Sequence, residues 1–132
     1  MNLKNTALQL LAFRPLWQLG LVVSIIAIIY LATAGSSHSI QITFSDKFQH
    51  MLAFAELTVL ARLGWPQASV SKSVVALIGF GLLIELIQAS LPYREFSVLD
   101  WVADAVGIAI GLAFARLIST VTRRWRHTLK YG

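Results

Sequence analysis

The sequence contains no cysteine among its 132 residues. Disulfide bonds, thiolate metal sites and cysteine nucleophiles are therefore excluded. Charge is also scarce, because only 13 % of the residues are Asp, Glu, Lys or Arg, whereas 57 % are hydrophobic. A soluble globular protein is about 25 % charged. The composition therefore indicates a membrane protein with no room for a separate soluble domain.

Basic residues outnumber acidic ones and give a formal net charge of +5. A positive charge is also found in nucleic-acid-binding proteins, which present a soluble basic face. Here the basic residues flank apolar runs instead, so we interpret them as topology signals and expect no nucleic-acid partner.

Four apolar stretches have the length of about 20 residues that a membrane span requires. We therefore predict an all-α polytopic membrane protein, a bundle of four transmembrane helices. Pro66 and Pro92 end the second and third stretches. The first is also compatible with a cleaved signal peptide, but it exceeds the usual apolar run of about 7 to 15 residues. The predicted spans are residues 16–34, 47–65, 71–91 and 98–118.

Lys and Arg are distributed unevenly about these spans. In a four-span arrangement nine of them fall on one side and only Lys47 and Arg94 on the other. Positive segments stay cytoplasmic, so we predict that both ends of the chain are cytoplasmic. Residues 1–15 are then an N-terminal cytoplasmic segment, 16–118 the membrane domain and 119–132 a basic tail. The tail is expected either to lie on anionic headgroups or to be a frayed soluble end.

Ionisable and polar residues gather near the outer ends of the later spans. Asp46 and His50 are four residues apart, as are Asp100 and Asp104, so each pair shares one helix face. The candidate ligand-binding residues are Asp46, Lys47, His50, Glu85, Gln88, Arg94, Asp100 and Asp104.

Burying such groups is costly, which is the argument that they are functional. One charged side chain at the bilayer centre costs about 2.5 to 3.5 kcal/mol on insertion scales. Acidic residues exceed basic ones in this cluster even if His50 is protonated, so the site must hold protons, admit water or bind a cation. Small residues recur every four positions from Ala103 to Ala115, and they predict a close helix contact that places Asp104 inside the bundle.

Each of these residues also has a purely structural interpretation. Ser97 and Asp100 fit a capping box at the start of the fourth span. Asp46 fits an N-terminal helix position, Arg94 a structural bridge to Glu85 or Asp100, and His50 a buried partner of a carboxylate. The uncharged stretch 35–45 is expected to be an outer loop with a short extended segment, and Glu56 receives no assigned role.

The residues 46–54 (DKFQHMLAF), 85–88 (ELIQ), Arg94, Ser97 and 100–107 (DWVADAVG) together resemble the VanZ-like family of membrane proteins. The resemblance covers about residues 44–115. The family pattern D-K-x-x-H, E-x-x-Q, R and D-x-x-x-N falls on the eight candidate residues, except that Asp104 stands where the family usually has Asn. The resemblance implies a multi-pass protein of the bacterial cytoplasmic (inner) membrane, in a family whose namesake confers low-level resistance to the glycopeptide teicoplanin.

Three functions are compatible with these observations. The first is a cell-envelope protein whose outer cluster recognises the headgroup of a membrane lipid, a lipid-linked compound or a glycopeptide, with Arg94, Lys47 and His50 contacting phosphate. The second is an integral membrane enzyme acting on a lipid-linked phosphate or glycolipid. The third is an ion-coupled transporter, which four spans would form only as a homo-oligomer. No established metal motif is present, and no cofactor is expected.

Overall fold

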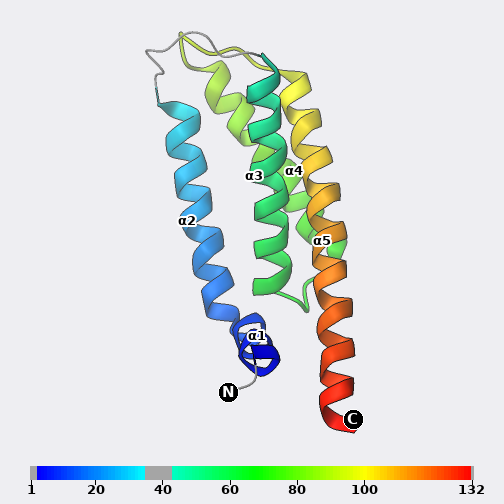
Figure 1. Ribbon diagram of the computed structural model, residues 1–132. Coiled ribbons are helices and arrows are strands. Elements are labelled where there is room, and N and C mark those ends of the chain that lie inside the picture. Colours follow the sequence, from blue (N-terminus) through cyan, green and yellow to red (C-terminus); the bar gives the residue numbers. More distant parts are fainter. Residues whose placement is uncertain (1–2, 35–42, 132) are drawn as a thin grey trace.

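The protein is a bundle of α-helices. The computed structural model describes residues 3–34 and 43–131, and every regular element within them is α-helical. Consecutive long helices run in opposite directions, so both termini lie at the same end of the bundle (Figure 1). The helices are α1 (Leu3–Ala12), α2 (Arg14–Thr33), α3 (Thr43–Gly64), α4 (Val70–Ala89) and α5 (Val98–Tyr131).

Three of these helices are long and apolar enough to cross a membrane. They are α2, α4 and the segment Val98–Lys130 of α5. The second predicted span corresponds to α3, which is long enough but carries charged residues from Asp46 to Arg62 along its length. Length and composition therefore support three of the four predicted spans.

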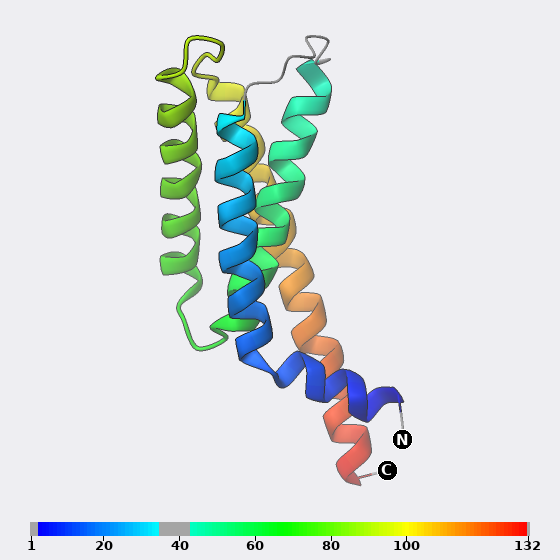
Figure 2. The same ribbon diagram turned by 90° about the vertical axis from the view of Figure 1, so that its left-hand side faces the viewer.

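Both ends of the chain are helical outside the predicted spans. The N-terminal segment contains the helix α1, which lies across the base of the bundle (Figure 2). The fourth span was predicted to end at residue 118, but α5 continues without a break to Tyr131. Its 34 residues span about 51 Å, against about 30 Å for the hydrocarbon core. The basic tail is therefore a helical extension rather than a frayed end. Of the predicted outer loop 35–45, residues 35–42 lie outside the described residues, and residues 43–45 belong to α3.

Helices α3 and α5 form the closest contact in the bundle. A Cβ atom added at Gly107 would collide with the carbonyl oxygen of Met51, and one added at Gly111 would lie 2.5 Å from Cβ of Thr58. Only glycine allows the two backbones to approach this closely, which confirms the contact expected from the small residues. A buried apolar cluster lies beside this contact and comprises Phe54, Leu57, Leu77 and Ile108.

Candidate functional site

An ion pair joins the N-terminal ends of α3 and α5. The Lys47 ammonium donates to Oδ1 of Asp100 at 2.8 Å. Asp100 is buried and lies in the first turn of α5. One of the three ammonium N–H donors is therefore used within the protein, and the lysine side chain remains 28 % exposed.

One helical turn deeper, a second pair joins the same two helices. Nδ1 of His50 lies 2.9 Å from Oδ1 of Asp104. Asp104 is 0 % exposed, which confirms its predicted position inside the bundle. Gly81 of α4 makes room for it, because a Cβ added there would lie 2.6 Å from the other oxygen of Asp104. His50 is therefore the partner of a buried carboxylate, as one of its predicted interpretations stated. This pairing is compatible with a further role for the imidazole ring.

Glu85 of α4 reaches the start of α5. Its Oε2 accepts a hydrogen bond of 2.9 Å from the backbone N–H of Ser97, and its side chain is fully buried. Ser97 in turn accepts from the backbone N–H of Asp100 at 3.2 Å. The predicted capping box is thus half correct, because Glu85 binds the N–H that Asp100 was expected to bind. The Asp100 carboxylate is left for Lys47.

The remaining candidates lie around the same end of the bundle. Gln88 is buried and donates to the backbone carbonyl of Ala32 at 3.4 Å, which ties α4 to α2. Asp46 lies in the first turn of α3. Arg94 does not form the structural bridge that was suggested for it. Within the described part of the chain its half-buried guanidinium has no hydrogen bond or ion pair.

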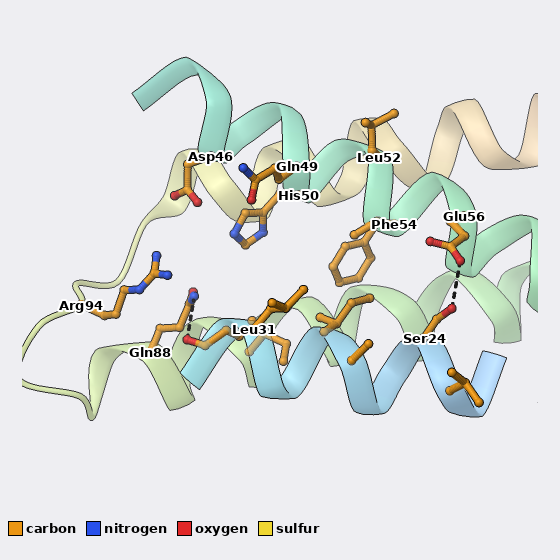
Figure 3. Close-up of a pocket in the computed structure, with 16 residues that line it drawn as sticks. Ser24, Leu31, Asp46, Gln49, His50, Leu52, Phe54, Glu56, Gln88 and Arg94 are labelled. Atoms are coloured by element: carbon orange, nitrogen blue, oxygen red, sulfur yellow. Dashed lines mark hydrogen bonds between the residues drawn. The ribbon is translucent and has the colours of Figure 1, made fainter. Parts of the chain in front are cut away.

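A groove between α2, α3 and α4 begins at these residues. Its volume is about 490 Å³. Figure 3 shows Asp46, Gln49 and His50 of α3 at one end of the groove, facing Gln88 and Arg94. Between the two ends the lining is apolar and includes Val23, Ala27, Ile28, Leu31, Phe54 and Ile84, and it is polar again at the far end, at Ser24 and Glu56. The groove therefore has a polar mouth and an apolar floor.

Glu56 lies at the far end of the groove and accepts a hydrogen bond from the Ser24 hydroxyl at 2.9 Å (Figure 3). No role for Glu56 was predicted, because its partner lies 32 residues away on another helix.

The site carries more negative than positive charge when its groups have their usual ionisation. Asp46, Glu85, Asp100 and Asp104 supply four carboxylates, and Lys47 is paired with one of them. Two buried oxygens, Oε1 of Glu85 and Oδ2 of Asp104, have no hydrogen-bond partner among the described residues. Unpaired buried carboxylate oxygens are energetically costly, so this end of the bundle favours a proton or a cation.

Comparison with known proteins agrees with the pattern of these residues. The family model described as VanZ/LLP1 matches residues 2–119. No curated protein and no solved structure matches the chain.

Proposed function

Since the chain belongs to the VanZ/LLP1 family, we propose that it crosses the bacterial cytoplasmic membrane four times and binds the phosphate-bearing headgroup of a lipid at one end of its bundle. The proposal has three parts: the fourth span, the orientation and the ligand.

The fourth span is α3, whose polar residues are largely turned towards neighbouring helices. Its 22 residues span about 33 Å, enough for the hydrocarbon core. Thr58 is fully buried, Lys47 and His50 pair with α5, and Glu56 bonds to α2. Pairing and burial between helices are the usual conditions under which polar residues occur in a membrane.

The orientation follows from the distribution of basic residues. The end of the bundle that carries both termini and the turn between α3 and α4 is the end to which nine of the eleven Lys and Arg residues belong by sequence (Figure 1). We assign this end to the cytoplasm. The polar mouth of the groove then faces the outside of the cytoplasmic membrane.

The observation that carries the ligand assignment is the groove with the Arg94 guanidinium at its mouth, which has no hydrogen bond or ion pair with any of the described residues. Arg94 is suited to phosphate because its planar guanidinium donates two parallel hydrogen bonds. Gln49, His50 and Gln88 line the same mouth, and Asp46 lies across it as an acceptor for headgroup hydroxyl or amine groups. The apolar floor accommodates hydrocarbon. An amphiphile with an anionic head and an acyl chain matches both parts of the groove.

The test is lipid binding by the purified full-length chain, measured by native mass spectrometry. Dioleoyl phosphatidylglycerol and dioleoylglycerol share their acyl chains and differ in the phosphate headgroup. We expect the phospholipid to bind more tightly, and Arg94→Ala to weaken it about ten-fold or more, since a hydrogen bond to a charged group contributes about 1.5 to 3 kcal/mol. Arg116→Ala, at an exposed position on α5, is the matched control. Equal binding of both lipids, or no effect of Arg94→Ala, would refute the assignment; preferential binding of a glycopeptide would redirect it.

A second candidate is an enzyme that acts on such a lipid. The observation in its favour is the pairing of His50 with Asp104 beside the groove, since a carboxylate that orients an imidazole is a common arrangement in acid–base catalysis. Release of phosphate or of a headgroup from the bound lipid, lost in His50→Gln, would distinguish turnover from binding.

A further inference from the structure

We propose that Asp46, His50 and Asp100 bind a divalent transition-metal ion at the mouth of the groove. One ligand atom from each of these residues lies within 4.8 Å of the others. A metal at about 2.0 to 2.2 Å from nitrogen and oxygen ligands holds those ligands about 3 to 4.4 Å apart. In a tetrahedral site the separation is about 3.3 to 3.6 Å, so the farthest pair of ligand atoms needs to close by at most about 1.5 Å.

The local structure explains why these three residues converge. Asp46 and His50 are four residues apart on α3 and therefore project from one face of the helix. Asp100 reaches the same place from the first turn of α5, and the close α3–α5 contact at Gly107, about two turns further along the helix, holds the two helices together. Oδ1 of Asp100 is held by Lys47, which leaves its second oxygen for the ion.

A separate observation concerns the orientation of His50. Its Nδ1 lies 2.9 Å from the fully buried Asp104, so an Nδ1–H donated to that carboxylate leaves the lone pair on Nε2. Histidine ligands of metals nearly always have their second nitrogen fixed in this way by a carboxylate, a carbonyl or water. Asp104 thus occupies the position of an orienting residue behind the ligand.

The charge of the surroundings favours a cation independently of this geometry. The unpartnered buried oxygens of Glu85 and Asp104 belong to the same cluster as the three ligands, and Lys47 is the only Lys or Arg among the described residues that forms a salt bridge there. A divalent ion would offset much of the negative charge that remains.

The ligand types restrict the metal. One imidazole and two carboxylates favour Zn²⁺ or Mn²⁺ over Mg²⁺ and Ca²⁺, which take oxygen ligands almost exclusively. Three protein ligands leave further coordination positions open towards the groove. The inference does not depend on the lipid assignment, because the metal itself is the probe.

The test uses the full-length chain in detergent, with any affinity tag removed and metals stripped by a chelator. Mn²⁺ is titrated and the free ion is followed by electron paramagnetic resonance. We expect one saturable site per chain that Zn²⁺ displaces. Asp46→Asn, His50→Gln and Asp100→Asn should each weaken binding at least ten-fold, whereas the control Glu95→Gln, which changes an exposed neighbouring carboxylate, should leave it unchanged.

Two variants of Asp104 distinguish its orientation of the His50 ring from the effect of its negative charge. Asp104→Asn keeps an acceptor for the Nδ1–H of His50 and should change affinity less than three-fold, while Asp104→Ala removes the acceptor and should weaken binding about 10- to 100-fold. Equal losses in both variants would assign Asp104 a purely electrostatic role and would contradict the proposed orientation.

A final measurement leaves all three proposed ligands unchanged. In a chain whose other two histidines, His38 and His127, are replaced by Gln, bound Mn²⁺ should show the pulsed-resonance coupling of one imidazole nitrogen. No saturable Mn²⁺ binding, no nitrogen coupling, or an equal loss in the Glu95→Gln control would overturn the proposed site.

Discussion

Glu85 and Ser97 are joined by a hydrogen bond of 2.9 Å in which a carboxylate of α4 accepts the backbone N–H that precedes the first turn of α5. Helices begin with several N–H groups that have no partner within the helix, and a carboxylate is a favourable acceptor near this positive end. Here the acceptor comes from the preceding helix. The same bond therefore fixes the loop between α4 and α5 and the position of the site residues on α5.

This bond predicts a specific loss of stability in Glu85 variants. Glu85→Ala removes the acceptor and leaves a half-buried N–H unsatisfied, so we expect the free energy of unfolding to fall by about 1 to 2 kcal/mol. Glu85→Gln keeps an oxygen acceptor and should lose less. Unfolding by sodium dodecyl sulfate in mixed micelles measures the effect. The control is Leu86→Ala, at an exposed position of the same helix, and an equal loss there would contradict the capping role.

Much of the site was predictable because helical spacing alone determines which residues share a face. The spacing of Asp46 and His50, and of Asp100 and Asp104, placed each pair correctly, and the small residues of α5 placed Asp104 inside. Residues four apart lie on the same face of a helix whatever the arrangement of the helices around it. The family resemblance added the order of the motifs.

The remaining features depend on partners that lie far apart in the sequence. No neighbouring residue in the sequence indicates that Glu85 accepts the backbone N–H of Ser97 or that Glu56 bonds to Ser24. The same holds for Arg94, whose guanidinium has no partner among the described residues. The length of α5 was missed for another reason. Alternating basic and apolar residues after 118 resemble a surface segment, whereas helix propagation continues as long as no breaking residue intervenes, and the next glycine is Gly132.

The closest helix contact predicts a difference between two glycines. Gly107→Ala places a methyl group against the backbone of Met51 and should destabilise the protein by about 1 to 3 kcal/mol, as overpacking usually does. Gly79 has nothing within 4 Å of an added Cβ, so Gly79→Ala should be neutral or slightly stabilising. Both variants are compared in the same unfolding assay, and similar values for the two would show that α3 and α5 are not held at this contact.

The proposed topology predicts the accessibility of single cysteines. The chain has no cysteine of its own, so each introduced thiol is the only one present. Glu95 and Gln67 are both exposed but lie at opposite ends of the bundle, in the segments that follow α4 and α3. A membrane-impermeant maleimide should label Glu95→Cys in intact spheroplasts and Gln67→Cys only after lysis. The reverse pattern would invert the orientation, and labelling of both in intact spheroplasts would refute the four-span arrangement.

The bond between Ser24 and Glu56 predicts an energetic coupling between α2 and α3. Its length of 2.9 Å lies within the normal range, and it links two helices at the end of the groove opposite Arg94. Hydrogen bonds between membrane helices contribute about 0.6 kcal/mol on average. A double-mutant cycle of Ser24→Ala and Glu56→Ala should therefore give a coupling free energy of about 0.5 to 1 kcal/mol, with Glu56→Gln retaining part of it through its amide oxygen. Because the cycle subtracts each side chain's separate effect, additive losses would mean that this hydrogen bond does not contribute to the association of α2 with α3.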